Sequence, residues 1–389
     1  MSVTAPPGFV AIGGAAGIKA GGVPDVAVVA TAEGRAVPAA GVFTANLAAA
    51  APVQVSRAHL AATGGRAAGV LLTSGNANAA TGAAGRAAAE RLCAAVAGDL
   101  GATAEEILVC QTGLIGIPFP IESVLPELAD IVMARNPSAE AAAKAARAIM
   151  TTDSVPKEVV VPSDGFTVGA MAKGAAMLAP NMATMLAVCT TDAAVDAATL
   201  QACLADAVSA SFNTITVDGC TSTNDTVLVL ANGLGASPSS AVLTAALYEA
   251  CRSLAEQMVD DAEGATKVAH VHVRGAVSDE AAHIAARKVA DSMLVQCSLF
   301  GEDPYWGRII SELGSAGTPF DIDRVLLAYG STVVCAGGVG VPHDAAAVAA
   351  HMAGRHVVLD CDLGLGTGEA VVLGADLGYG YIDENKTTS

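Results

Sequence analysis

The sequence has 389 residues, of which 53% are hydrophobic but only 3% are aromatic. This length allows a large core and more than one domain, and that core must be built mainly from Ala, Val, Leu and Ile. Lys and Arg number 20 against 38 Asp and Glu, which gives a net charge of −18. Because no basic excess is available to neutralise phosphates, the composition argues against nucleic-acid binding and against anionic membrane surfaces.

Cysteine usage and the opening segment bear on the cellular compartment. The 9 cysteines are scattered, and no two form a Cys-x-x-Cys pair. Such an unclustered set predicts reduced, buried thiols in a cytoplasmic protein. The opening MSVTAPPGFV lacks a basic region followed by a long apolar run, so we expect no signal peptide. No stretch reaches the ~18 uninterrupted apolar residues of a membrane span.

The first part of the chain predicts strands and one helix. Short apolar runs between Gly and Pro predict strands at 25–32, 40–44, 69–74 and 107–110, and an amphipathic pattern predicts a helix at 85–97. The last of these strands runs into Thr112-Gly113. A hydroxyl and exposed backbone N–H groups at that point can supply an oxyanion hole, although a plain turn fits the pattern as well.

Two helices and a hairpin come next. The helices are predicted at 121–135 and 138–150, and the strands 157–162 and 166–173 are predicted to pair across the turn Ser163-Asp164-Gly165. The second strand ends at Lys173, whose ammonium group can either hold a substrate carboxylate or lie at a solvated strand end.

Residues 173–192, KGAAMLAPNMATMLAVCTTD, are mostly small and apolar. Thr184 follows the small residue Ala183 and precedes the apolar run 185–188. A β-branched hydroxyl residue at the start of an apolar run is typical of a buried strand whose hydroxyl is satisfied locally. The pattern alone therefore favours an ordinary core residue at this position.

The second half of the chain alternates helices and strands. Helices are predicted at 197–211, 240–260, 279–290 and 344–352, and strands at 268–274, 324–328, 332–335, 356–361 and 369–374. Glu263 lies just beyond the second of these helices, where acidic residues oppose the helix dipole, and this local conflict suggests a functional role. The loop 212–226 concentrates hydroxyls and carboxylates, which can serve capping alone or function.

Two apparent ligand motifs fail their context tests. His270 and His272 share one face of a predicted strand, but no third metal ligand is evident, so we predict no metal site. The segment Gly364 to Gly368, GLGTG, precedes a strand instead of opening a helix, which excludes the dinucleotide fingerprint. We predict a hairpin loop there.

The segment KGAAMLAPNMATML resembles the signature of the ornithine acetyltransferase family, the glutamate N-acetyltransferases of arginine biosynthesis. Further segments resemble other motifs of that family, and they are SGNANAATG at 74–82, TGLIG at 112–116, TTD at 151–153, VDGCTSTNDT at 217–226, FGEDPYWGR at 300–308 and the C-terminal tail. Tyr305 stands where the family usually has Asn, and Gln296 stands where it tends to have Lys.

The resemblance implies an α/β protein of two lobes, with sheets packed between helices in the N-terminal-nucleophile arrangement. It also implies self-cleavage between Ala183 and Thr184, into an α chain of 1–183 and a β chain of 184–389 that assemble as two of each. The freed α-amine of Thr184 would then serve as base for its own hydroxyl, since an α-amine has a reference pKa of about 7.7 to 8.0.

The resemblance further assigns site roles. Thr184 is the expected nucleophile, and Thr112 and Gly113 are the expected oxyanion donors. The expected substrate contacts come from both halves of the chain: Thr151, Lys173, Thr184, Glu263, Asn385 and Ser389. The implied reaction moves the acetyl group of N2-acetylornithine to glutamate without a cofactor. Whether acetyl-CoA is a further substrate stays open.

Two other functions stay open at this point. The same nucleophile could serve an amidase or aminopeptidase in which water accepts the acyl group. Alternatively, the chain could be an unprocessed ligand-binding protein in which Thr184 is a core residue.

Overall fold

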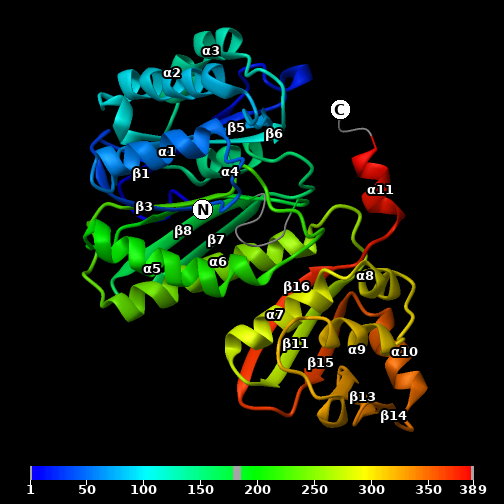
Figure 1. The fold of residues 1–389 in the computed structure, drawn as a ribbon. Helices are drawn as coiled ribbons and strands as arrows, with labels where there is room; N and C mark the ends of the chain where they lie inside the picture. Colours follow the sequence, from blue (N-terminus) through cyan, green and yellow to red (C-terminus); the bar gives the residue numbers. More distant parts are fainter. Residues whose placement is uncertain (1, 178–184, 387–389) are drawn as a thin grey trace.

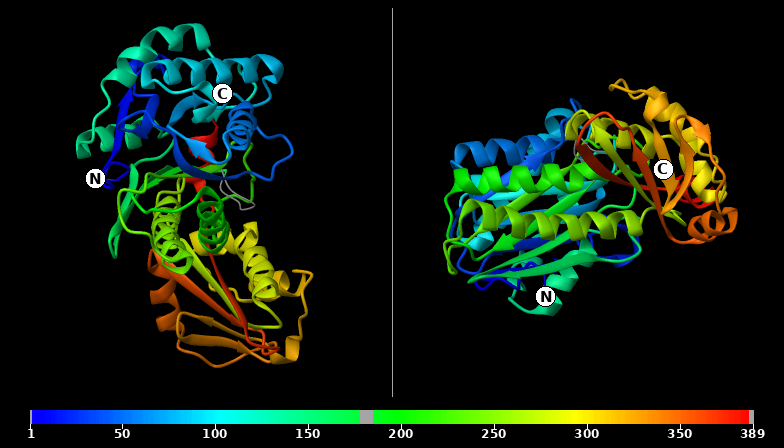
Figure 2. Two further views of the ribbon diagram at one scale, coloured as in Figure 1. Left: turned by 90° about the vertical axis from the view of Figure 1, so that its left-hand side faces the viewer. Right: turned by 90° about the horizontal axis from the view of Figure 1, so that it is seen from below.

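The computed structural model describes residues 2–177 and 185–386, drawn as coloured ribbons in Figure 1. The predicted cleavage pair Ala183 and Thr184, and the predicted contact Ser389, lie outside these described residues. Two lobes lie side by side, and the C-terminal segment runs from the second lobe back toward the first (Figures 1 and 2). The two-lobed α/β architecture predicted from the sequence is therefore confirmed.

The first lobe contains two sheets stacked face to face. The strands of the upper sheet in Figure 1 follow the order β1 (Phe9–Gly14), β2 (Val26–Thr31), β5 (Gly69–Asn76) and β6 (Ile107–Leu114). The strands of the lower sheet follow the order β4 (Arg66–Ala67), β3 (Val37–Phe43), β10 (Thr226–Ala231), β9 (Leu186–Thr191), β8 (Phe166–Lys173) and β7 (Lys157–Ser163). Aliphatic side chains from both sheets form one buried cluster between them.

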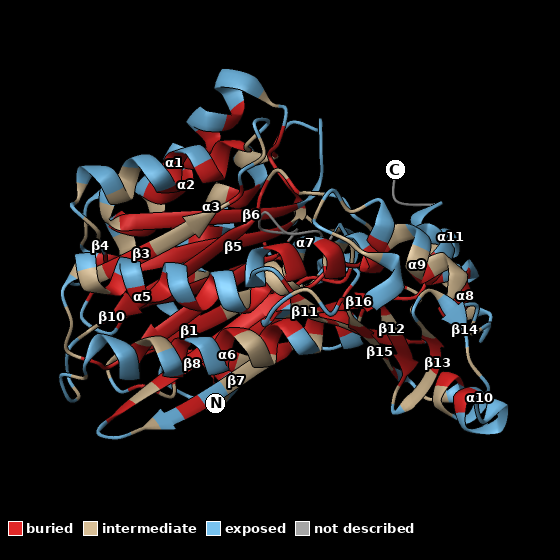
Figure 3. Ribbon diagram, turned by 60° about the horizontal axis from the view of Figure 1, so that its bottom comes forward, coloured by how far each residue is buried: buried red, intermediate tan, exposed pale blue. Residues whose placement is uncertain are grey.

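Helices cover the outer faces of both sheets. α2 (Gly82–Leu100) and α3 (Ile121–Met133) share a buried cluster with the upper sheet, and α5 (Ala197–Ala210) and α6 (Ser240–Asp260) share one with the lower sheet. α1 (Ala51–Ala62) packs at the β6 edge of the upper sheet, and α4 (Ala139–Ala148) packs at its β1 edge. Each helix turns a buried face inward and an exposed face outward (Figure 3).

The second lobe is one six-stranded sheet with helices packed on it. Its strand order is β14 (Val339–Gly340), β13 (Thr332–Ala336), β12 (Leu326–Tyr329), β15 (His356–Asp362), β11 (Val268–Ala276) and β16 (Gly368–Ala375). Its helices are α7 (Asp279–Ala290), α8 (Met293–Phe300), α9 (Gly307–Gly314) and α10 (Ala345–Ala353). Short 3-10 turns occur in the two lobes at Ala20–Gly22, Ala104–Glu106, Phe212–Thr214 and Ile322–Arg324. The last helix, α11 (Tyr379–Asn385), leaves this lobe.

The sequence predictions hold for most elements but fail at the GLGTG segment. β7 and β8 pair antiparallel as the predicted hairpin. β15 and β16, by contrast, do not pair with each other, because β11 lies between them, parallel to β15 and antiparallel to β16. The loop between them therefore crosses the end of β11, and the hairpin prediction is wrong. Among the described residues, no helix is long and apolar enough to cross a membrane.

Candidate active site

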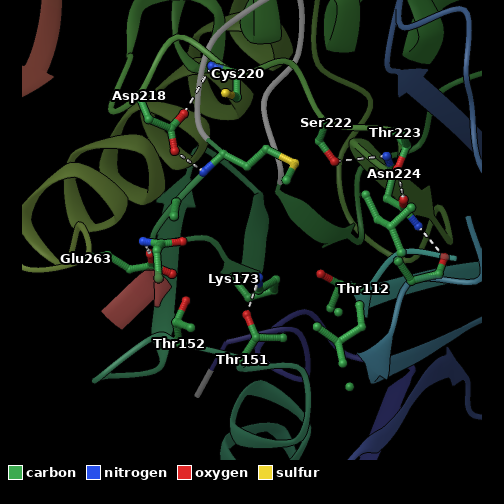
Figure 4. Close-up of a pocket in the computed structure, with 18 of the residues that line it drawn as sticks. Thr112, Thr151, Thr152, Lys173, Asp218, Cys220, Ser222, Thr223, Asn224 and Glu263 are labelled. Atoms are coloured by element: carbon green, nitrogen blue, oxygen red, sulfur yellow. Dashed lines mark hydrogen bonds between the residues drawn. The ribbon is translucent and has the colours of Figure 1, made fainter. Parts of the chain in front are cut away.

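A cavity of about 610 Å³ opens where the two sheets, the loop 218–224 and α11 meet (Figure 4). Its lining includes six of the residues that the sequence assigned to a site: Thr112, Gly113, Thr151, Lys173, Glu263 and Asn385. In the close-up, Glu263 and Asp218 lie on one side, Thr112 lies on the other, and Lys173 and Thr151 lie between them. The fold thus brings together residues spread from β6 to the C-terminal helix.

The predicted oxyanion pair lies where two parallel strands end side by side. In the β5–β6 register, Ser74 is opposite Thr112 and Gly75 is opposite Gly113. Gly113 has φ +129°, and a Cβ on it would lie 2.3 Å from the carbonyl carbon of Gly75. Only glycine fits this backbone, because both the conformation and the approach of β5 exclude a side chain. This close approach keeps the Thr112-Gly113 backbone at the pocket wall.

Asn224, in the loop before β10, fixes the same strand end from the opposite side. Its Nδ2 donates to the carbonyl of Gln111 at 2.8 Å and to the carbonyl of Ala77 at 2.6 Å. The Gln111 carbonyl belongs to the peptide bond that leads into Thr112. Asn224 is buried, so these hydrogen bonds hold the two chain segments in fixed relation. The hydroxyls and carboxylates of this loop stand out in the sequence, but the pattern does not identify the role of Asn224.

Lys173 lies at the end of β8 and is buried, with 3% of its surface exposed. Its Nζ donates to Thr151 Oγ1 at 2.7 Å and lies 3.8 Å from Asp153 Oδ2. Burial lowers the pKa of Lys173, although the carboxylate of Asp153 opposes that effect. Thr151 and Thr152 both line the cavity, and Lys173 bonds to the hydroxyl of Thr151.

Asp153 organises the charges beneath this lysine. It accepts the N–H groups of Thr151 at 3.0 Å and Gly174 at 2.7 Å, and Lys157 Nζ donates to it at 2.7 Å. Burial alone would raise the pKa of Asp153, but the ammonium groups of Lys173 and Lys157 hold it at about 2. Asp153 is therefore a buried, fully ionised carboxylate beside the pocket.

Glu263 forms the acidic wall opposite the oxyanion strand, and α11 closes over it. Glu263 is buried, its N–H donates to the carbonyl of Ala175 at 2.9 Å, and its Oε2 accepts from Asn385 Nδ2 at 2.7 Å. The hydroxyl of Tyr381 donates to Asp218 Oδ2 at 3.1 Å. These contacts confirm that the C-terminal segment folds back on the site and brings Asn385 to it.

The chain is similar to known proteins over nearly its whole length. The model of the ArgJ family matches residues 10–388. The chain belongs to the ArgJ family. The arginine biosynthesis bifunctional protein ArgJ of Mycolicibacterium paratuberculosis is 45% identical over 397 residues, which cover 100% of this chain and 96% of that protein. ArgJ of Mycobacterium tuberculosis is 44% identical over 397 residues, with the same coverage of both chains.

Among solved structures, the ornithine acetyltransferase from Mycobacterium tuberculosis, complexed with ornithine, is 45% identical. The match covers 46% of this chain and 94% of that chain, with a TM-score of 0.44. A second match is the crystal structure of ArgJ from Bacillus halodurans, which is 35% identical over 51% of this chain and 96% of that chain, with a TM-score of 0.48.

Met185 is the residue that follows the predicted nucleophile Thr184 in the family signature. Met185 is held by a second buried carboxylate, Asp225, whose Oδ1 accepts the Met185 N–H at 3.0 Å. Within the described chain, the other oxygen of Asp225, Oδ2, has no hydrogen-bond partner. Burial raises the pKa of Asp225 well above its usual range, in spite of the Met185 N–H and the nearby hydroxyl of Ser222.

The structure adds pocket residues that sequence reasoning did not single out. Lys19, Asp218 and Tyr381 line the cavity, and so does Cys220, which is exposed. Cys220 and Cys297 thus depart from the prediction of buried thiols, while the other seven cysteines are buried and all are free. Lys19 ends the stretch Ala15-Ala16-Gly17-Ile18-Lys19, whose pattern by itself gives no reason to expect a side chain in the site.

Among the described residues, no group of three or more His, Cys, Asp or Glu side chains comes together that could hold a metal ion. The two strand histidines weighed at the sequence level lie in the second lobe, where His270 Nε2 is 3.1 Å from Nδ1 of His356. Burial, followed by the neighbouring His356, lowers the pKa of His270.

Proposed function

We propose that this chain is a glutamate N-acetyltransferase of arginine biosynthesis that moves the acetyl group of N2-acetylornithine to glutamate. The observation that carries this proposal is the pocket, in which the lysine Lys173 lies between the carboxylate Glu263 on one side and Thr112 on the other. Family membership and the names of the curated relatives support the same reaction.

Lys173 and Glu263 suit the two charged ends of the donor. The ammonium group of Lys173, held by Thr151, is suited to the α-carboxylate of N-acetylornithine. The buried carboxylate of Glu263, aligned by Asn385, is suited to its side-chain ammonium group. With both ends held, the acetyl carbonyl is directed toward Thr112 and Gly113. Ser389, outside the described residues, is proposed as a further contact.

In the first half-reaction, Oγ of Thr184 attacks the acetyl carbonyl while its hydroxyl proton moves to the α-amine of Thr184. The Thr112 hydroxyl and the Gly113 N–H stabilise the oxyanion of the tetrahedral intermediate, and each such donor typically contributes about 2.7 to 4 kcal/mol. The intermediate then loses the nitrogen of ornithine, which takes the proton back. Ornithine leaves, and an acetyl ester remains on Thr184.

In the second half-reaction, the neutral amine of glutamate attacks this ester. The same donors stabilise the second oxyanion, and the carbon–oxygen bond to Thr184 breaks. The proton lost from the glutamate amine returns to the Thr184 hydroxyl by way of the α-amine. N-acetylglutamate leaves with the free enzyme restored, so the cycle needs no cofactor.

The proposal includes self-cleavage between Ala183 and Thr184, because the base in this mechanism is a free α-amine. The products would be chains 1–183 and 184–389, assembled as two of each. The proposed break falls between β8 and β9, which are neighbours in one sheet, so the two products would stay joined by that sheet.

Acetyl-CoA is proposed as a further acetyl donor that would acetylate Thr184 in place of N-acetylornithine. The word bifunctional in the relatives' names supports this extension. Formation of N-acetylglutamate from acetyl-CoA and glutamate alone tests it, and a purified enzyme that yields none limits the activity to acetyl recycling.

Intact-mass measurement of the purified wild-type protein and of Thr184→Ala tests the nucleophile. We expect two fragments for the wild type, the second beginning at Thr184, and one uncut, inactive chain for the variant. An uncut wild-type chain would favour a ligand-binding protein. Release of free acetate from N-acetylornithine at the full rate without glutamate would instead favour an amidase.

A further inference from the structure

The proposed reaction sets a problem of charge for the pocket. The donor N-acetylornithine carries an ammonium group on its side chain, whereas the acceptor glutamate carries a carboxylate. Glu263 suits the first group and repels the second. The described lining contains two cationic side chains, Lys19 and Lys173. If Lys173 holds the α-carboxylate of each substrate, Lys19 remains for the second carboxylate of glutamate.

Lys19 is presented to the pocket by a rigid turn. The carboxylate of Asp25, which is fully buried, accepts the N–H groups of Ala16 at 2.7 Å, Ile18 at 2.6 Å and Lys19 at 2.9 Å. Three such hydrogen bonds to one carboxylate fix the backbone of the turn. The backbone of Lys19 is therefore already fixed before a ligand binds.

The stem of Lys19 lies across Gly75 at the end of β5. A Cβ at Gly75 would lie 3.0 Å from Cγ of Lys19, so the absence of a side chain there leaves room for the lysine. Gly75 is opposite Gly113 in the strand register. The path of the Lys19 side chain thus follows the strand ends that carry the oxyanion donors.

The ammonium groups of Lys19 and Lys173 donate hydrogen bonds to two consecutive residues, Met150 and Thr151. Lys19 Nζ donates to the carbonyl of Met150 at 2.6 Å and to that of Pro24 at 3.2 Å, while Lys173 Nζ donates to Thr151 Oγ1 at 2.7 Å. An ammonium group has three donors, and these two contacts occupy two of those of Lys19. Within the part of the chain that the structure describes, one N–H of Lys19 therefore remains for a ligand.

The surrounding charges favour an anion between the two lysines. Burial lowers the pKa of Lys19, and Lys173 lowers it further, while Asp25 and Asp153 act in the opposite direction. A carboxylate that enters between the ammonium groups relieves their mutual repulsion. An ammonium group placed there would add to it.

We propose that Lys19 binds the side-chain carboxylate of the acceptor glutamate and so makes the second half-reaction specific for a dicarboxylate. This inference rests on the proposed acetyl transfer. It assigns different partners to the two side-chain ends, with Glu263 for the ornithine ammonium group and Lys19 for the glutamate carboxylate.

The test compares two acceptors on the same acetylated enzyme. Transfer to glutamate is measured by N-acetylglutamate formation, and transfer to isotopically labelled ornithine is measured by its exchange into N-acetylornithine. Lys19→Met keeps the stem and removes the charge. Lys19→Gln also keeps a donor for the Met150 carbonyl, so the test does not depend on one variant folding.

For both variants we expect kcat/KM for glutamate to fall by about tenfold or more, as for the loss of one charged hydrogen bond. Most of the change should appear in KM. The ornithine exchange should stay within about twofold of wild type, and Lys19→Arg should retain the preference for glutamate. Lys288→Met, in α7 of the second lobe, removes an exposed lysine as a matched control and should change neither rate.

An equal fall in both acceptor reactions would make Lys19 a structural residue and overturn the proposal, as would unchanged kcat/KM for glutamate. Failure of the acetyltransferase assignment itself is distinguishable, because wild-type enzyme would then show neither the exchange nor the transfer.

Discussion

Two buried carboxylates beside the pocket, Asp153 and Asp225, have opposite electrostatics. Both accept backbone N–H groups, Asp153 from Thr151 and Gly174 and Asp225 from Met185. Asp153 lies against two lysines, which hold its pKa at about 2, whereas burial raises the pKa of Asp225. The two aspartates therefore differ in direction: lysines lower the pKa of Asp153, and burial raises the pKa of Asp225.

The difference shows how a low-aromatic, alanine-rich core tolerates polar chemistry at its centre. Asp153, Lys157 and Asp261 form a continuous buried ion network that ends at Lys173, so the pocket lysine has a fixed counterion. Asp225 forms no ion pair with a described residue, although the charge of Lys173 opposes the burial that raises its pKa, and it accepts the Met185 N–H before β9. Substitutions that leave shape unchanged but remove charge should separate these two roles.

The largest effect is expected for Asp153→Asn. This change leaves Lys157 and Lys173 without their shared buried counterion, and breaking a buried ion pair typically costs about 3–5 kcal/mol. Urea unfolding should therefore show a free energy of unfolding lower by about that amount. Both variants make the same isosteric change. If Asp153→Asn lowered the free energy of unfolding no more than Asp225→Asn, the claimed difference between the two aspartates would be wrong.

Lowering the pH should reduce the free energy of unfolding of the wild-type protein by less than Asp153→Asn does. The usual pKa of 3.8 is lowered to about 2 in the folded protein, so the native state binds fewer protons and stability falls as pH drops through this interval. The expected change is about 2 kcal/mol between pH of about 4 and about 2.

This pH effect is measured as a difference between two proteins, since other carboxylates also titrate there. The gap in unfolding free energy between wild type and Asp153→Asn should narrow as pH falls from about 4 to about 2. A gap that stays constant with pH would mean that Asp153 is not ionised in the folded state.

The smallest loss is expected for Asp225→Asn, which should not lower the free energy of unfolding by more than about 1 kcal/mol at neutral pH. An amide oxygen can still accept the Met185 N–H, and no charge is lost if the folded acid is neutral. Because the folded pKa of Asp225 is raised, the native state binds more protons than the unfolded state, and stability falls as pH rises above the usual value of 3.8 toward the folded pKa.

Asp225→Asn should therefore abolish that decline with rising pH, as followed by urea unfolding at a series of pH values from about 4 upward. A loss at neutral pH as large as that for Asp153→Asn would show that Asp225 is ionised and paired, and the contrast between the two sites would disappear.

The sequence predicted most of the regular elements and those parts of the site that lie in recognisable motifs, but not β1, β10, α8, α9 or α11. The β7–β8 hairpin brings Lys173 to the pocket as predicted, and the loop before β10 lines it. α1 was missed because its short apolar spacing lies among strand-like segments. The loop GLGTG was misassigned because strand order depends on long-range pairing, and β11 comes between β15 and β16.

Lys19 and Asp153 show why the rest of the site could not be predicted. The role of Lys19 depends on a glycine of β5 that leaves space for its stem and on a carbonyl at the end of α4. The state of Asp153 depends on lysines from two other strands. Such relations between distant segments exist only after the sheets have assembled.

The acetyl-enzyme is the most direct test of the central claim. The protein is incubated with N-acetylornithine alone and its fragments are weighed by mass spectrometry, before and after glutamate is added. We predict that the fragment beginning at Thr184 gains one acetyl group and loses it when glutamate is supplied. No acetylated fragment, or an acetyl group attached to another residue and unaffected by glutamate, would contradict the account.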